Sequence, residues 1–271
     1  GVQPGDSCLL AVMTDNSDDK NFPPGKRQYT LDFAYHGGIY RDVWMIGKSS
    51  VAITDALEAD KVAGGGVFVH FDNISGKKAE VYVDTEVHNS GKRTRTVAVE
   101  TVLVDAGDVP VKRVSQQVKL QAGESKTVRQ RFAVRNPKLW SPDSPYLYRI
   151  QSRVKAGHEV LDGGVTRVGI RKAEFKGKDG FWLNGKPFGQ LVGANRHQDF
   201  AYVGNALPNS QQWRDAKRLR DAGCTIIRVA HYPQDPAFMD ACDEMGLFVI
   251  VATPGWQYWN KNPEFAKLVH R

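Results

Sequence analysis

The sequence predicts a multidomain protein of β plus α/β class, in which a β-sandwich is followed by the N-terminal part of a (β/α)8 TIM barrel. Strand-like segments recur at roughly 8–12-residue spacing through the middle of the chain. Beyond residue 190, strands and helices alternate, which predicts a parallel sheet with helices on its faces. The 271 residues are enough for two domains or three small ones. The predicted domains are 1–48 for the end of a first β domain, 49–170 for the sandwich and 171–271 for the barrel portion.

The composition is that of a globular chain, with 41% hydrophobic and 25% charged residues. No run of about 20 apolar residues occurs, so neither a transmembrane helix nor a membrane partner is expected. The cysteines Cys8, Cys224 and Cys242 form no Cys-x-x-Cys pair, which argues against a disulfide framework and against a structural zinc site. They leave the redox compartment open.

Residues 1–48 contain too few strand candidates to form a core of their own. An apolar run covers 8–13, and an aromatic stretch interrupted by Gly37-Gly38 covers 29–44. Two or three strands cannot close a core alone. We therefore expect the last strands of a β domain whose earlier part precedes this sequence.

The middle part of the chain is predicted to be all-β. Residues 67–71 and 79–87 are rich in β-branched and aromatic residues, and the second stretch alternates apolar with polar positions. Further strands are predicted at 94–104, 111–120, 125–134 and 146–154. This succession predicts a β-sandwich, although the Cys-Trp-Cys pattern of antibody domains does not occur. Pro142 and Pro145 exclude a helix from the connection at 139–146.

The net charge of +7 is concentrated in residues 91–135, where ten Lys or Arg minus four Asp or Glu give +6. Such a concentration can indicate a nucleic-acid partner, which would predict salt-sensitive retention on DNA. Here the basic residues alternate with Val, Ala and Phe, as on the solvated face of strands. No motif that reads nucleic acid accompanies them. We favour a solvated face and expect no nucleic-acid partner.

The third part shows a β-α-β-α-β order. Strands are predicted at 190–194, 225–230 and 247–251, and helices at 211–220, from 236 to Gly246, and within 257–271. Asp235 is the expected N-cap of the second helix and Pro236 its first residue. A dinucleotide-binding half would carry a Gly-rich turn after its first strand. Because this loop carries no such turn, a barrel cut after its third strand is the better prediction, and we expect an internal piece of a larger protein.

Polar and aromatic side chains follow each predicted barrel strand. The three groups are Asn195 to Asp199, Arg228 with His231-Tyr232-Pro233, and 253–259 with Trp256 and Trp259. Catalytic and binding groups collect at the carboxyl ends of barrel strands. Hydrogen-bonding groups beside flat aromatic rings suit a sugar, although a lone histidine in such a loop is more often structural. The spacing matches no common metal-ligand pattern, so no metal is expected.

At these residues the chain resembles the β-galactosidase branch of glycoside hydrolase family 2. The stretches that carry the resemblance are 38–43 (GIYRDV), 139–148 (LWSPDSPYLY), 180–187 (GFWLNGKP), 195–199 (NRHQD), 228–233 (RVAHYP) and 242–246 (CDEMG). The resemblance implies a jelly-roll domain ending near residue 48, an immunoglobulin-like sandwich and a TIM barrel. The glucuronidase branch usually has Lys where Arg196 stands, and the mannosidase branch lacks the His-Tyr-Pro of 231–233. The resemblance therefore favours the galactosidase branch.

The resemblance implies hydrolysis of terminal non-reducing β-galactosides, or related glycosides, by a retaining mechanism. One Glu acts as general acid/base and a second as nucleophile, about 5–5.5 Å apart. In the family they follow barrel strands four and seven, so both are expected beyond Arg271. We therefore expect no catalytic residue in this chain and no activity from it alone. No cofactor is implied, although a divalent or monovalent cation is compatible with the longer enzyme.

The resemblance also assigns substrate-binding residues by correspondence. They are His197, His231, Asp199, Arg228, Trp256 and Asp32. The two histidines match positions that hydrogen-bond the hydroxyls of the terminal sugar, and the arginine matches a residue that supports the nucleophile. Asp199 and Trp256 are expected at the rim of the sugar site. Asp32 is expected to reach this site from the jelly-roll domain. A bacterial periplasmic or secreted setting is slightly favoured over the cytoplasm, and the oligomeric state stays open.

One further alternative is a non-catalytic carbohydrate-binding or scaffold module built on the sandwich. It predicts sugar affinity within 49–170, where the sequence shows no aromatic platform. A carbohydrate partner is expected in both cases.

Overall fold

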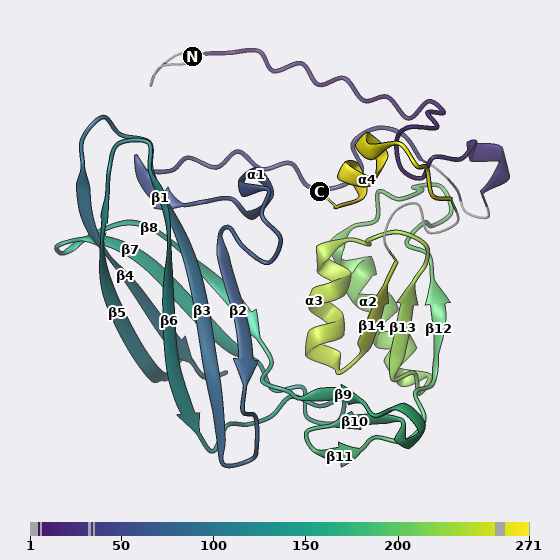
Figure 1. Cartoon of the computed structure of the whole chain (residues 1–271). Helices are drawn as coiled ribbons and strands as arrows, with labels where there is room; N and C mark the ends of the chain where they lie inside the picture. Colours follow the sequence, from purple (N-terminus) through teal and green to yellow (C-terminus); the bar gives the residue numbers. More distant parts are fainter. Residues whose placement is uncertain (1–4, 6, 32–33, 35, 253–257, 271) are drawn as a thin grey trace.

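The computed structural model describes residues 5, 7–31, 34, 36–252 and 258–270. A β-sandwich and a barrel portion lie side by side, and the N-terminal segment runs along the top of both (Figure 1). This segment, which we define as residues 7–48, reaches the upper end of the barrel portion and then returns to the sandwich.

The N-terminal segment forms one 3-10 turn, η1 (Gln28–Thr30), and no strand among its described residues. A strand gains its ladder hydrogen bonds only from a neighbouring strand, and the described residues of this segment pair with none. Its apolar side chains are accordingly uncovered, with Met45 100% and Leu9 96% exposed. The assignment of this segment to a jelly-roll domain stays a prediction.

The sandwich consists of two antiparallel sheets. One sheet holds β1 (Val51–Ile53), β2 (Val67–Asp72), β3 (Lys78–Asn89) and β6 (Ser125–Arg135). The other holds β5 (Pro110–Leu120), β4 (Arg95–Val104), β7 (Tyr148–Ala156) and β8 (Glu159–Val168), in that spatial order. A short helix, α1 (Ala56–Ala59), follows β1. Alternate residues of β3 and β4, such as Val81, Val83, Val99 and Leu103, point into the core between the sheets.

The barrel portion has a parallel sheet in the order β12 (Gly193–Arg196), β13 (Ile226–Val229) and β14 (Phe248–Val251). The helices are α2 (Asn209–Asp221), α3 (Pro236–Met245) and α4 (Pro263–His270). Below the sheet, β9 (Ala173–Phe175), β10 (Phe181–Leu183) and β11 (Lys186–Pro187) form a small antiparallel sheet, with η2 (Gly177–Asp179) between the first two. None of the described helices is long and apolar enough to cross a membrane.

The end signals of α3 agree with the sequence prediction. The Asp235 carboxylate accepts a hydrogen bond from the Ala237 N–H at 2.8 Å, and Pro236 is the first helical residue. Gly246 ends the helix in the left-handed conformation, with φ of 75°. Ile227 and Val229 of β13 are fully buried beside Ala216 and Phe238 of the helices. Because side chains alternate along a strand, Arg228 must face the opposite side of the sheet, toward the barrel interior.

The connection between β6 and β7 packs against the base of the barrel portion. Trp140 is buried, its indole Nε1–H donates to the Asp243 carbonyl at 2.8 Å, and its ring lies against Phe248. Arg220 donates to the Pro142 carbonyl at 2.9 Å. A Cβ on Gly246 would lie 2.2 Å from the Pro142 carbonyl oxygen. The two parts therefore meet through backbone contacts as well as through side chains.

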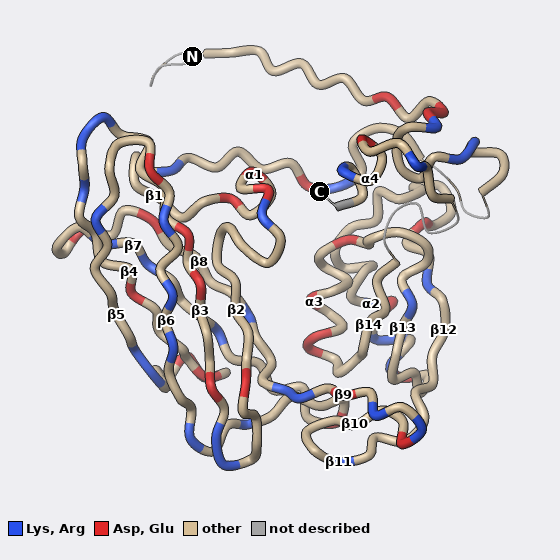
Figure 2. Tube along the Cα trace, in the orientation of Figure 1, with Lys and Arg blue, Asp and Glu red and all other residues tan. Residues whose placement is uncertain are grey.

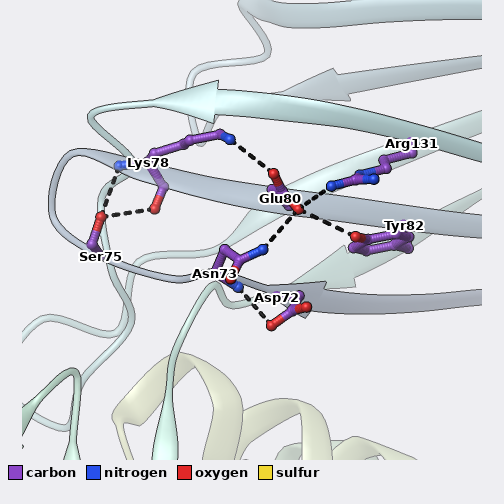
Figure 3. A network of polar contacts seen from close by, with 7 residues as sticks. All are labelled: Asp72, Asn73, Ser75, Lys78, Glu80, Tyr82 and Arg131. Carbon is purple, nitrogen blue, oxygen red and sulfur yellow. Dashed lines mark hydrogen bonds and ion pairs between the residues drawn. The ribbon is translucent and has the colours of Figure 1, made fainter.

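The ten Lys and Arg residues of 91–135 are exposed, and acidic positions lie on neighbouring strands of the sandwich (Figure 2). Arg113 pairs with Glu100 at 3.0 Å, and Arg129 pairs with Asp84 at 3.4 Å. Glu80 of β3 lies at the centre of a larger network (Figure 3). Its carboxylate accepts from Lys78 at 2.8 Å, from Asn73 at 3.0 Å, from Tyr82 at 3.2 Å, and from Arg131. These contacts agree with the solvated-face interpretation.

The Glu80 network makes stability depend on acid pH. The hydrogen bond from Lys78, then those from Asn73 and Arg131, lower the pKa of Glu80 to about 2 from its ordinary 4.5. A carboxyl whose pKa is lower in the folded state stabilises fully above about pH 4.5 and loses that contribution as the pH falls toward 2. We expect Glu80→Gln to be less stable than the parent near neutral pH, and the difference in unfolding free energy to shrink as the pH falls toward 2. Urea unfolding across this pH range measures the difference, with the exposed Glu159→Gln as control; a pH-independent difference would contradict the prediction.

Candidate functional site

The site is built at the upper edge of the barrel sheet, where β12 and β13 end. His197 follows β12 directly, and His231 lies two residues after β13. Their ring centroids are 5.1 Å apart and their planes are nearly perpendicular, at 87°. His231 is 9% exposed and His197 is half-buried. The parallel pairing of the two strands thus brings the two predicted sugar-binding histidines together.

The other predicted site residues are placed differently. Asp199 is exposed in the loop after β12. Arg228 is half-buried and pairs in register with Asn195 of β12 and Ile250 of β14, so these three side chains share the interior face of the sheet. Asp32 and Trp256 lie outside the described residues. The roles of all of them stay predictions.

The position of the two catalytic glutamates also stays a prediction. Both are expected beyond Arg271, and Arg271 itself lies outside the described residues. The helix predicted within 257–271 is present as α4, which ends at His270.

Tyr232, next to His231, also belongs to the upper edge of the sheet. Its ring centroid lies 6.4 Å from that of His197. Burial raises the pKa of the Tyr232 hydroxyl, a hydrogen bond from the Gln198 backbone lowers it, and the nearby Asp199 carboxylate raises it. The pKa is therefore above its ordinary value of 10.0. The phenol is protonated at neutral pH and can both donate and accept hydrogen bonds.

Arg196 does not belong to the edge, contrary to the expectation that it lies among the rim residues. It is 6% exposed, and it donates to Gln234 at 2.6 Å, to Gln212 at 2.8 Å and to Asp215 at 2.7 Å. Its guanidinium lies 4.0 Å from the ring centre of Phe238 on α3. The strand alternation explains the difference, because Arg196 is in register with the buried Val229 and therefore points to the helices.

The N-terminal segment contacts all three loops that follow the barrel strands. Arg41 donates to the Pro233 carbonyl at 2.7 Å, after β13. A Cβ on Gly204, after β12, would meet the His36 ring at 2.8 Å. Asn260, after β14, donates to the Lys20 carbonyl at 2.8 Å. The upper edge of the sheet is therefore covered by residues nearly 200 positions earlier in the chain (Figure 1).

A cavity of about 570 Å³ lies between this segment and the turn 231–233. From the barrel side it is lined by Asn205, His231, Tyr232 and Pro233, and from the N-terminal segment by residues between Thr14 and Arg41. Among the described residues, its charged lining consists of Asp15, Asp18, Asp19, Lys26 and Arg41, and these five carry a formal charge of −1 (two minus three). A volume of this size suits a small ligand.

Sequence reasoning assigned no role to Tyr40, Arg41 or Asn205. The first two fall within the stretch 38–43 that carried part of the family resemblance, and this was the available signal for them. Nothing in the local sequence marks Asn205, whose buried side chain lines the cavity through the fold of its loop. Within the described part of the chain, no group of three His, Cys, Asp or Glu residues is arranged to hold a metal ion.

Comparison with known proteins gives consistent family matches. The family model described as "Glycosyl hydrolases family 2" matches residues 66–171, and the model of the family's TIM barrel domain matches residues 174–266. A β-galactosidase of Thermoanaerobacter pseudethanolicus is 34% identical over 92% of this chain and 31% of its own length. A β-glucuronidase of Bacteroides fragilis is 29% identical over 93% of this chain and 35% of its own length.

Solved structures show the same relationship. Bacteroides uniformis β-glucuronidase 2 superimposes with a TM-score of 0.84 and 28% identity, over 94% of this chain and 30% of that one. A glycosyl hydrolase family 2 member from Bacteroides cellulosilyticus superimposes with a TM-score of 0.68 and 31% identity, over 76% of this chain and 27% of that one. The chain thus spans about a third of the length of these two curated relatives.

Proposed function

We propose, since this chain belongs to glycosyl hydrolases family 2, that it supplies part of the sugar-binding site of a retaining β-galactosidase. The observation that carries the proposal is the pair His197 and His231, with ring centroids 5.1 Å apart at the ends of two parallel strands. Each imidazole offers a donor and an acceptor nitrogen. Two such groups at near right angles match the divergent hydroxyls of one terminal sugar.

The remaining residues of the upper edge have supporting roles in this proposal. Tyr232 adds a neutral hydroxyl beside His197. Arg228 faces the barrel interior, where a cation stabilises a carboxylate that must stay ionised as a nucleophile. The two catalytic glutamates are proposed to lie on strands outside this sequence. Glu244 and Glu264 do not replace them, since both lie in helices and the first pairs with Arg167.

A galactoside is favoured over a glucuronide by the charge of the cavity. The relatives carry both names, so family membership leaves the sugar open. A glucuronide brings a carboxylate, which would meet three aspartates against two cations in the described lining. Like charges raise the free energy of a bound anion. The lining beside His231, which does not include His197, therefore supports a neutral sugar.

Activity and binding together test the proposal. We expect the chain alone to release no nitrophenol from 4-nitrophenyl β-galactoside, because retaining hydrolysis needs two carboxylates across the bond. We expect it to bind methyl β-galactoside more tightly than methyl β-glucuronide, and His231→Gln to weaken this binding about tenfold. His158→Gln, exposed on the sandwich, is the matched control. Turnover that survives repurification, or a preference for the glucuronide, would contradict the proposal.

One aromatic cluster of the sandwich bears on the alternative of a carbohydrate-binding sandwich. Phe68, His70 and Tyr82 gather on the outer face of β2 and β3, although the sequence showed no aromatic platform there. The His70 and Tyr82 rings are parallel at 4.6 Å, and Arg131 lies 5.1 Å over Tyr82. Their faces thus cover one another, whereas a sugar needs an open ring face. Loss of galactoside binding in Tyr82→Ala but not in His231→Gln would favour this alternative.

A further inference from the structure

Arg41 makes a long-range contact with the turn that carries His231. Its guanidinium donates to the Pro233 carbonyl at 2.7 Å, across 192 positions of sequence, and lies 5.3 Å from the ring centre of Tyr40. The Arg41 Nε is buried and has no hydrogen-bond partner among the described residues. Within the described part of the chain, the hydrogen bond to Pro233 and the Tyr40 ring therefore define where this guanidinium lies.

The turn is held on its other side by barrel residues. The Gln198 side chain accepts from the Asp235 N–H at 2.9 Å, and the Gln234 side chain donates to the Arg196 carbonyl. These contacts fix the end of the turn that enters α3. Pro233 has no N–H to donate, so its carbonyl is the remaining backbone group through which residue 233 can be held. Arg41 supplies that contact from the N-terminal segment.

We propose that Arg41 is a positioning residue for His231, and that the N-terminal segment thereby sets the geometry of the sugar-binding histidine pair. The effect of this positioning on sugar binding rests on the proposed function. His231 precedes Pro233 by two residues and lines the same cavity as Arg41. Release of the Pro233 carbonyl lets the turn move while β13 and α3 keep their places.

The contact needs the charged N–H donor of the Arg41 guanidinium and a side chain long enough to reach the Pro233 carbonyl. A charged donor forms a stronger hydrogen bond to a carbonyl than a neutral donor does. Lysine keeps the charge and one donor, so Arg41→Lys can restore the contact in part. Alanine removes it altogether. Arg27, on the same segment, is exposed and is not part of the cavity lining, so Arg27→Ala is a matched control.

The test uses the whole chain with ¹⁵N-labelled histidine. We expect Arg41→Ala to shift the His231 ring resonances, and to weaken binding of methyl β-galactoside about tenfold. Arg41→Lys should recover a substantial part of both, and Arg27→Ala should change neither. Thermal unfolding establishes that each variant is folded; if Arg41→Ala is not, Arg41→Lys and Arg41→Gln give the comparison.

The outcomes separate this inference from the proposed function. If the parent binds the galactoside and Arg41→Ala binds it equally well with unchanged His231 resonances, positioning by Arg41 is overturned and the sugar site stands. If the parent shows no binding but Arg41→Ala still shifts His231, positioning stands and the proposed function fails. Equal loss in Arg41→Ala and Arg27→Ala, without a shift at His231, would also overturn the inference.

Discussion

Arg196→Met is expected to lower the free energy of unfolding of the barrel portion by about 3 kcal/mol, because it removes the buried partner of a largely buried ion pair. Arg196 lies between β12, α2 and α3, and its guanidinium pairs with Asp215 at 2.7 Å. Methionine fills a similar volume over Phe238 but leaves the Asp215 carboxylate with the Gln211 amide as its remaining donor. The side-chain oxygens of Gln212 and Gln234 lose the donor that Arg196 supplies. Each buried polar group left unpaired adds to the cost.

Amide hydrogen exchange in β13 reports this effect locally, since Ile227 and Val229 are fully buried beneath the same helices. Arg196→Lys keeps the charge but not the forked geometry, so an intermediate loss is expected. Arg214→Met, on the exposed side of α2, is the matched control and should cost little. A cost for Arg196→Met no larger than that of the control would show that the buried network does not stabilise the barrel portion.

Gly246→Ala is expected to cost about 3 kcal/mol or more, within the range of severe single substitutions. The added Cβ would lie 2.2 Å from the Pro142 carbonyl oxygen and 2.6 Å from its Cα, both of them backbone atoms. Neither α3 nor the 139–146 connection can move without disturbing the buried Trp140. The residue also has φ of 75°, where a side chain is strained.

Gly223→Ala separates the two causes. Gly223 has φ of 87° at the end of α2, and nothing lies within 4 Å of the position that a Cβ would take there. It should therefore cost only the left-handed strain, about 1 kcal/mol. The difference between the two variants in urea unfolding measures the contact between the sandwich and the barrel. Equal costs would mean that the connection at Pro142 moves freely away from α3.

Local patterns predicted most of the fold. β2 to β7 form where alternation and β-branched residues predicted strands, and the Asp235-Pro236 and Gly246 signals mark the ends of α3. β8 was missed because Gly163-Gly164 interrupts its pattern. β1 and β9 to β11 were missed because each has three residues or fewer, too short for a periodic signal. Their strand geometry comes from tertiary pairing.

The candidate site was predicted only where it is local. His197 and His231 follow strand ends, so parallel pairing alone brings them together. The Arg196 side chain points to the helices because it lies on the helix-facing side of β12. A strand of four residues is too short for its sequence to show which side faces the helices. The contact of Arg41 with Pro233 joins positions 192 residues apart, and no local pattern encodes it.

The most direct test of the proposed sugar site is a titration of the ¹⁵N-histidine-labelled chain with methyl β-galactoside. The account predicts that the His197 and His231 ring resonances shift along one saturable binding curve with the same Kd, because the two rings bind the same sugar. The sandwich histidines His70, His88 and His158 serve as internal controls and should stay unchanged. Saturable shifts confined to the sandwich histidines, or no saturable shift at either rim histidine, would contradict the account.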